Sequence, residues 1–123
     1  MVNATQFSVK VMPSIQSITA SDWDALSDGS PLLSHAFFSA LENSQSVGPD
    51  TGWNAYPLAI YTEDEKLVGA MPLYLKTHSY GEYVFDWAWA DAYDRNGIRY
   101  YPKLVSAIPF SPITSKRLLS QHV

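Results

Sequence analysis

The sequence predicts a mixed α/β fold of the α+β type, in a single domain that spans all 123 residues. Alternating apolar and polar residues at 7–11 indicate a first strand. Two further apolar segments, 54–62 and 67–76, flank the turn sequence EDEK and indicate an antiparallel hairpin. Between the first strand and the hairpin, an apolar residue recurs at every fourth position from Leu33 to Leu41. This spacing is typical of a helix that buries one face.

The first half of the chain has clear signals for where elements begin and end. The first strand ends near Pro13. A short helix follows with Ser21 as its N-cap, because acidic residues occupy the next turn. Ser30 and Pro31 open the second helix. The segment 44–53 contains two glycines and a proline, so we expect a loop there.

The second half continues the alternation of strands and helices. Pro72 in the second hairpin strand predicts an edge, a bulge or a bend. Three alanines favour a helix over 86–95, and Asn96–Gly97 ends it. The apolar run KLVSAIPF at 103–110 has the length of a strand, and Thr114–Ser115 indicate the start of a last helix. The predicted order is therefore β-α-α-β-β-α-β followed by a helix start.

The composition favours a folded, soluble domain, because 46% of the residues are hydrophobic and 14% are aromatic. No apolar run is long enough for a membrane span, and the N-terminus lacks a signal-peptide pattern, so we expect a cytoplasmic protein. The absence of cysteine excludes disulfides, thiolate zinc sites and cysteine nucleophiles. No two histidines have the spacing of metal ligands, so we expect no metal site.

Charge is distributed unevenly along the chain, whose net charge is -4. Residues 1–94 contain all of the acidic side chains, whereas residues 95–123 contain only basic ones. This asymmetry indicates an anionic ligand near the C-terminal segment and argues against a DNA-binding surface. The alternative interpretation is that the acidic part pairs with the basic end inside the fold.

The segment HSYGEYVFDWAWADAY, residues 78–93, places aromatic rings among carboxylates. As the wall of an active site, it offers Glu82, Asp86 and Asp91 as candidate general bases, each with a pKa raised by the surrounding rings. In the alternative interpretation, the tryptophans and tyrosines anchor the core and the acids cap the following helix. For the segment as a whole we favour the site wall.

Three blocks of the sequence resemble a known family. They are SPLLSHAFFSALENSQSVGPDTGW at 30–53, GAMPLYLKTHSYGEYVFDWAWADAY at 69–93 and YYPKLVSAIPFSPITSKRLL at 100–119. Together they are similar to the N-terminal part of the FemAB-like predicted N-acyltransferases, bacterial proteins related to the GNAT acetyltransferases and to the Fem enzymes of peptidoglycan synthesis. Members of that family are much longer, so we expect this chain to be an N-terminal fragment of a GNAT-like acyltransferase domain.

The resemblance implies an incomplete GNAT-like fold, in which the fourth strand leads into a helix N-terminus that binds the pyrophosphate of acyl-CoA. Unpaired N–H groups and nearby basic side chains suit that role. The usual loop of the superfamily is rich in glycine, whereas residues 98–123 contain none. The corresponding donor-site positions are Pro109, Phe110, Ile113, Thr114, Ser115, Lys116 and Arg117.

The implied reaction is attack by the amine of a small-molecule acceptor on an activated acyl donor. Acyl-CoA and charged tRNA both remain open as the donor, and Glu82, Asp86 and Asp91 are expected on the acceptor side. The fragment alone is expected to lack turnover. The alternative function is a non-catalytic binding or dimerisation domain, in which an unpaired strand edge at 103–110 pairs with a second copy.

Overall fold

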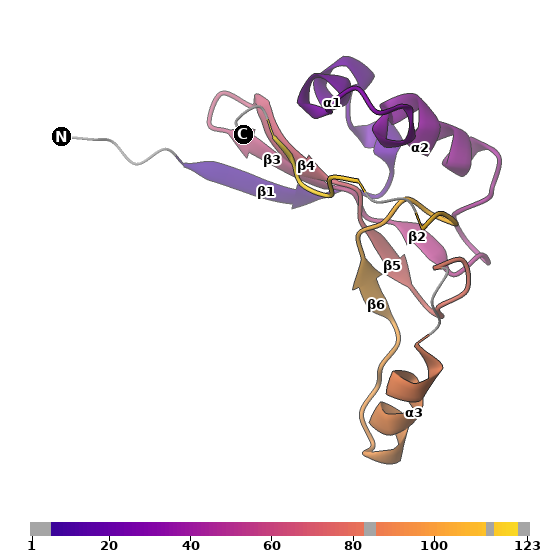
Figure 1. The fold of residues 1–123 in the computed structure, drawn as a ribbon. Helices are drawn as coiled ribbons and strands as arrows, with labels where there is room; N and C mark the ends of the chain where they lie inside the picture. Colours follow the sequence, from indigo (N-terminus) through magenta and orange to yellow (C-terminus); the bar gives the residue numbers. More distant parts are fainter. Residues whose placement is uncertain (1–5, 83–85, 113–114, 121–123) are drawn as a thin grey trace.

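The computed structural model describes residues 6–82, 86–112 and 115–120. Within these residues the protein has two antiparallel sheets and three α-helices, so the predicted α+β class is confirmed (Figure 1). The elements are, in order, β1 (Phe7–Val11), η1 (Ile15–Ser17), α1 (Ala20–Leu26), η2 (Pro31–Leu33), α2 (His35–Asn43), β2 (Trp53–Ala55), β3 (Leu58–Thr62), β4 (Leu67–Met71), β5 (Tyr74–Lys76), α3 (Trp87–Arg95), β6 (Lys103–Val105) and β7 (Leu119–Ser120).

The predicted hairpin is present, but each of its arms passes from one sheet into the other. The helix-covered sheet has the order β1-β3-β4-β7, and the projecting sheet has the order β2-β5-β6. Pro57 separates β2 from β3, and Pro72 separates β4 from β5. Proline lacks the N–H group that a continuous ladder requires, so both arms bend where the two prolines lie. Of the three features predicted at Pro72, an edge, a bulge or a bend, the bend is therefore confirmed.

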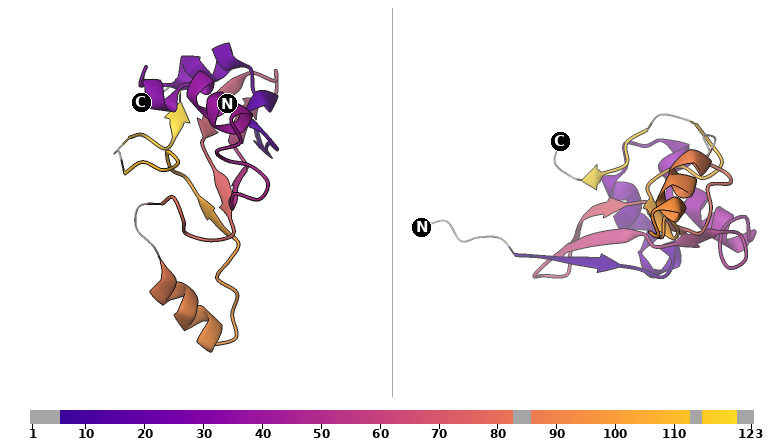
Figure 2. Two further views of the ribbon diagram at one scale, coloured as in Figure 1. Left: turned by 90° about the vertical axis from the view of Figure 1, so that its right-hand side faces the viewer. Right: turned by 90° about the horizontal axis from the view of Figure 1, so that it is seen from below.

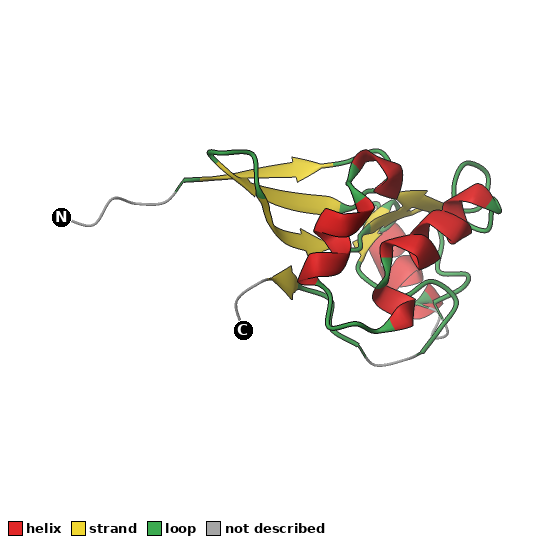
Figure 3. Cartoon of the chain, turned by 90° about the horizontal axis from the view of Figure 1, so that it is seen from above, coloured by secondary structure: helices red, strands yellow, loops and turns green. Residues whose placement is uncertain are grey.

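The core lies between the helix-covered sheet and α1 and α2 (Figures 1 and 3). Trp23 is fully buried there, its ring packs edge-to-face on Phe38 at 5.8 Å, and its indole N–H donates to the carbonyl of Leu33 at 2.9 Å. Leu33 and Phe38 are buried, and Phe37 and Leu41 are partly buried against them. The stripe predicted for the second helix therefore faces the core.

Helix starts differ from the predictions by a few residues. The N-cap of α1 is Thr19 instead of Ser21. The second helix begins as the 3-10 turn η2 at Pro31, and α2 itself starts only after Ser34. The hydroxyl of Ser34 accepts a hydrogen bond from the N–H of Phe37, which is the bond expected of an N-cap. This hydrogen bond fixes the start of α2, whereas Thr19 makes no side-chain capping hydrogen bond at the start of α1.

The projecting sheet has α3 at its far end, away from α1 and α2 (Figure 2). The predicted helix over 86–95 is confirmed, since α3 begins directly after Asp86, but none of its residues is buried. The strand predicted over 103–110 is shorter than expected, because β6 ends at Val105. β6 forms an edge of the projecting sheet, where it pairs with β5.

The helix start expected after Thr114–Ser115 is wrong for the residues that the structure describes. Residues 115–118 are not helical, and Leu119–Ser120 form β7, which pairs with β4 through Ala70 and Gly69. Leu119 is buried in this position. Burying a leucine at the sheet edge stabilises the fold more than an exposed first helical turn would, so the strand is favoured.

Candidate functional site

Two lysines occupy facing positions on the last two strands of the projecting sheet. Lys76 on β5 and Lys103 on β6 are register partners. Two ammonium groups in this arrangement repel each other unless an anion lies between them. Glu82 supplies that anion, with one carboxylate oxygen 2.7 Å from Lys103 Nζ and the other 3.4 Å from Lys76 Nζ. Its side chain is only 12% exposed, so water screens these contacts weakly.

Asp86 completes what we call the lysine–carboxylate cluster, which consists of Lys76, Glu82, Asp86 and Lys103. Asp86 forms an ion pair with Lys103 and accepts hydrogen bonds from the hydroxyls of Tyr100, at 2.7 Å, and Tyr101, at 2.5 Å. The loop after α3 returns both tyrosines to the start of the helix. Two hydroxyls and one ammonium therefore converge on a single carboxylate.

These contacts determine the protonation state of Asp86. Burial alone raises the pKa of this carboxyl, but the hydrogen bonds from Lys103, Tyr101 and Tyr100 outweigh burial and hold the pKa well below its usual range. Burial lowers the pKa of Lys103, and the bonds to Asp86 and Glu82 outweigh it, so that pKa is raised. The expectation of a raised pKa is therefore wrong for Asp86, which is an ionised acceptor.

Lys76 is the buried member of the cluster. Its side chain is fully excluded from water, its ammonium lies 3.8 Å from the ring centroid of Trp53, and it donates to the carbonyl of Tyr80 at 2.6 Å. Burial lowers its pKa, and the nearby Glu82 opposes that effect. The indole N–H of Trp53 donates to the same carbonyl at 3.0 Å. Two donors from β2 and β5 thus fix the position of Tyr80.

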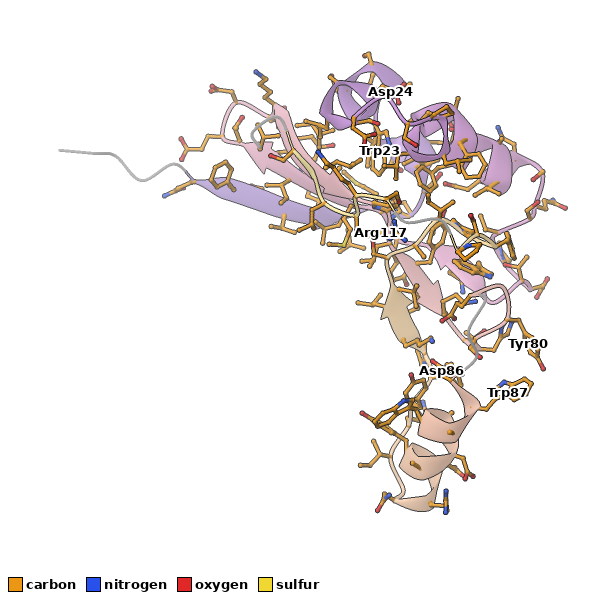
Figure 4. The ribbon with its side chains drawn as sticks, viewed as in Figure 1. Trp23, Asp24, Tyr80, Asp86, Trp87 and Arg117 are labelled. Atoms are coloured by element: carbon orange, nitrogen blue, oxygen red, sulfur yellow. The ribbon has the colours of Figure 1, made fainter. Side chains whose placement is uncertain are left out.

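A row of three rings, two of them exposed, lies beside the cluster. This aromatic row consists of His78, Tyr80 and Trp87, with ring centroids 4.9 Å apart for the first pair and 6.3 Å apart for the second. Tyr80 is 56% exposed and Trp87 is 58% exposed. Figure 4 shows both rings pointing outward next to Asp86.

The interpretation of the tryptophans in this segment as core anchors is wrong. Trp87 and Trp89 are both exposed, and no residue of α3 is buried. The acids also do not cap the helix through their side chains: Asp86 occupies the N-cap position, but its carboxylate makes no capping hydrogen bond. The carboxylate is directed instead to Lys103 and the two tyrosines.

The structure brings two of the three predicted acids together and leaves the third apart. Glu82 and Asp86 share Lys103 as an ion-pair partner. Asp91 lies on the outer surface of α3, is 62% exposed and pairs with Arg95 one helical turn away at 2.8 Å. Its ion pair is with its own helix and not with the cluster, so its location does not suggest an acid/base role beside Glu82 and Asp86.

The first residues of the predicted donor segment adjoin the cluster. Pro109 is buried, and the N–H of Phe110 donates to the carbonyl of Gly81 at 3.0 Å. The ring of Phe110 packs against Trp53 with centroids 5.2 Å apart. Trp53 therefore contacts both Lys76 and Phe110, and it connects the predicted donor segment to the predicted acceptor side.

The later donor positions lie elsewhere and in a different conformation. Ile113 and Thr114 are outside the described residues. Arg117 donates to the carbonyl of Ser106 at 3.1 Å and to that of Ser115 at 3.0 Å, whereas Lys116 is exposed. Figure 4 places Arg117 between the two sheets, well away from Asp86. Among residues 115–120 there is no helix N-terminus to bind a pyrophosphate.

Sequence reasoning missed several members of the site: Trp53, Lys76, Tyr100, Tyr101 and Lys103. The alternation in β5 was a usable signal, because Lys76 follows the buried Tyr74 by two residues and therefore points to the same side. A lysine at an inward position needs an anionic partner. The interpretation that the acidic part pairs with the basic end is confirmed for Lys103, which contacts both Glu82 and Asp86.

The part of the chain that the structure describes contains neither a metal-ligand cluster nor a membrane-spanning helix. No three His, Asp or Glu side chains group closely enough there to hold a metal ion. None of the helices among these residues is both long enough and apolar enough to cross a membrane.

Comparison with known proteins gave one match. Neither the curated proteins nor the solved structures contain a match to this chain. The model of the FemAB-like family, described as peptidoglycan biosynthesis/recognition, matches residues 14–123. The matched range contains the whole lysine–carboxylate cluster and the aromatic row. The chain is therefore a member of the FemAB-like family of peptidoglycan biosynthesis and recognition proteins.

Proposed function

We propose that this chain binds the acceptor in an N-acyltransferase that transfers an acyl or aminoacyl group to an amine of peptidoglycan or of its precursor. One observation carries the proposal: the exposed aromatic row lies directly beside the lysine–carboxylate cluster (Figure 4). Family membership supports peptidoglycan as the source of the acceptor. The GNAT-like arrangement implied by the resemblance stays part of this proposal.

The aromatic row suits a ligand with both apolar and charged parts. Exposed Tyr80 and Trp87 present ring faces that pack on the apolar face of a sugar or attract a substrate ammonium. The cluster next to them offers charged hydrogen-bonding groups of both signs. Because Lys76 and Trp53 hold the Tyr80 carbonyl, the row is positioned before the ligand binds, which lowers the entropic cost of binding.

In the proposed reaction the amine nitrogen forms a bond to the acyl carbon, while the thiolate of CoA or the ribose oxygen of tRNA leaves. The amine proton must pass to a base. Asp86 is a poor base because its pKa is lowered, and Asp91 lies away from the cluster. Glu82 is therefore the remaining candidate among the three predicted acids, and Asp86 positions Lys103, Tyr100 and Tyr101.

The donor assignment is also part of the proposal. Phe110 and Lys116 are exposed, and they offer a ring and a cation to an acyl-CoA or to the acceptor end of a charged tRNA. Phe110 adjoins the cluster through Gly81 and Trp53, which supports a donor segment that begins close to the proposed acceptor side. Both donor classes therefore belong in the experiment.

A second candidate is peptidoglycan recognition without catalysis. Both carboxylates of the cluster are already engaged: Glu82 with two lysines, and Asp86 with one lysine and two tyrosines. Carboxylates engaged in this way stabilise a binding surface, and Asp86, whose pKa is lowered by its partners, is a poor proton acceptor. This observation favours the non-catalytic alternative, and the experiment must separate binding from turnover.

The test is a titration of the protein with soluble muropeptides, followed by tryptophan fluorescence and by NMR. Trp87→Ala should weaken binding by about tenfold or more, in keeping with the loss of one stacking ring. Trp89→Ala is the matched control, because Trp89 lies on the same helix, is 66% exposed and is directed to the opposite side. Equal losses in both variants, or no binding at millimolar muropeptide, would contradict the proposal.

Turnover is tested in the same samples with acetyl-CoA and with aminoacyl-tRNA as alternative donors. Transfer that Glu82→Gln abolishes, while muropeptide binding is retained, supports the acyltransferase. Binding that depends on Trp87 without transfer from either donor supports recognition by this chain and is also the result expected if turnover requires the intact enzyme.

A further inference from the structure

Among the described residues, α1 and α2 cover the helix-covered sheet on one side only (Figures 1 and 3). Ala59, Ala70 and Leu119 point toward α1 and α2 and are buried. The opposite side includes Phe7, Val9 and Val11 of β1, which are 57%, 61% and 54% exposed. We call these three side chains the β1 stripe. Single exposed apolar residues are common on protein surfaces, but three in register along one strand indicate an interaction surface.

β1 is also an edge strand, and the register shows which of its backbone groups are directed outward. It pairs with β3 on one side, and no described strand lies on the other. Met12 N–H donates to Pro57 O at 2.8 Å, one step beyond the pair Val11 and Leu58. Hydrogen-bonded pairs alternate in an antiparallel ladder, so the backbone groups of the even-numbered β1 residues face β3. Those of Phe7, Val9 and Val11 face the open edge.

We propose that two copies of this chain pair through β1, antiparallel about a twofold axis at Val9. Val9 then faces Val9 of the second copy, and Phe7 faces Val11 of the second copy. Each of these pairs exchanges both N–H···O bonds, because the backbone groups of all three residues are directed outward. The two β1 stripes become neighbours on one face of a continuous sheet. This inference is independent of the proposed function.

The charge of Lys10 favours this strand register over the registers that are shifted by one residue. With the axis at Val9, Lys10 faces Ser8 of the second copy, so no two ammonium groups are opposed. With the axis at Lys10, this lysine faces Lys10 of the second copy, and like charges directly opposite each other destabilise a strand pair. With the axis at Ser8, Val11 would have to pair with residue 5 of the second copy, which is outside the described residues. The pattern FSVKV thus has its best self-complementarity at Val9.

The edge itself lacks the features that usually prevent such pairing. β1 contains no proline and no bulge against β3 at its own residues, and its single charge, Lys10, lies over the ring of Tyr61 at 5.2 Å. β2 and β6, the two edges of the projecting sheet, have only three residues each. β1 is therefore the longer template for a second strand.

The area fits a weak dimer. Three apolar side chains, each more than half exposed, offer on the order of 300 Å² per copy. With the strand backbones and flanking side chains, the pair reaches about 1,000 Å², near the lower limit for a specific interface. We therefore expect a dissociation constant in the micromolar range.

Cysteine cross-linking tests the register directly, because the natural sequence contains no cysteine. Val9→Cys should form a disulfide-linked dimer under mild oxidation, since paired strand residues have Cα atoms about 5.5 Å apart. Lys10→Cys alone should stay largely unlinked, whereas an equal mixture of Ser8→Cys and Lys10→Cys should link across the two chains. Equal linking of Val9→Cys and Lys10→Cys would overturn the proposed register.

Sedimentation of the unmodified protein tests the dimer itself. We expect dimer to form as concentration rises through the micromolar range, and Val9→Pro to weaken it at least about tenfold. That substitution removes an outward N–H and leaves the ladder to β3 intact, which circular dichroism must verify. A monomer at several hundred micromolar would overturn the proposal, and the cross-linking result stands even if Val9→Pro does not fold.

Discussion

The helix-covered sheet packs against α1 and α2, and side chains such as Trp23 and Phe38 are excluded from water there. The projecting sheet carries α3, none of whose residues is buried, and its far end is joined by ion pairs and tyrosine hydrogen bonds. Apolar burial thus dominates the first region, whereas at the far end of the second, beyond the buried Trp53 and Tyr74, the contacts are mainly between charged and polar groups. Apolar burial is insensitive to pH, whereas the cluster around Asp86 depends on its ionisation.

The comparison also indicates where function resides. Apolar packing tolerates few changes in shape, so the region under α1 and α2 acts as a scaffold. The charged end presents exposed rings beside buried ammonium and carboxylate groups, an arrangement that costs desolvation energy. Placing such groups in the less packed region leaves the aromatic row open to a ligand.

The largest effect is expected in the scaffold. Trp23→Ala removes a fully buried ring and its hydrogen bond to Leu33 O, so the free energy of unfolding should fall by about 3–5 kcal/mol. Urea denaturation of this variant and of Trp89→Ala provides the measurement. Because Trp89 is exposed, Trp89→Ala should lower the free energy of unfolding by less than about 0.5 kcal/mol. If both variants lost similar amounts of unfolding free energy, burial would not distinguish the helix-covered sheet from the region that contains α3.

The next largest effect is expected at the buried end of the cluster. Lys76→Met removes the ammonium between Trp53, Glu82 and the Tyr80 carbonyl, and should cost about 3 kcal/mol in unfolding free energy. Lys66→Met, in the exposed turn, is the control and should change it by less than about 0.5 kcal/mol. A neutral Lys76→Met would show that methionine packing on Trp53 replaces the ion pair.

A pH-dependent difference should follow from Asp86. Because its folded-state pKa is lowered, its contribution to stability is present above the unfolded pKa, about 4, and is lost as the pH falls through and below that value. The unfolding free energy of the natural protein should therefore fall more steeply between about pH 5 and pH 2 than that of Asp86→Asn. Parallel curves for the two proteins would exclude Asp86 as the source of this acid sensitivity.

The smallest effect is expected at Asp91. Its ion pair with Arg95 is exposed and lies within one helix, so Asp91→Asn should cost only about 0.3–0.5 kcal/mol, an effect that salt should reduce further. Muropeptide binding should be unchanged. A strong loss of binding in Asp91→Asn would restore Asp91 as a site residue and would contradict its separation from the cluster.

Short-range signals predicted much of the architecture. β1, the hairpin, α2 and α3 were all foreseeable from periodicity, prolines and alanines. The last segment was not, because a two-residue strand such as β7 has no periodicity to detect. β7 forms because Leu119 pairs with Ala70 on β4, a residue 49 positions away in the chain.

The candidate site was predictable only in part. The segment 78–93 indicated Glu82 and Asp86 through its mixture of rings and acids, and the structure brings both to Lys103. Asp91 carried the same local signal, yet helix geometry turns it outward. The sequence did not indicate that Lys76 and Lys103 lie opposite each other, because the pairing of residues on neighbouring strands depends on a register that the sequence does not give.

The sequence by itself determined most of the elements, the break at Pro72, and the separation of acidic and basic residues along the chain. Only the tertiary structure decided which charges meet. Helix and strand periodicity act over a few neighbouring residues, whereas the pKa of Asp86 depends on a lysine and two tyrosines that reach it from across a loop. An ionisable group responds to what surrounds it in space, and that arrangement exists only after the sheets have formed.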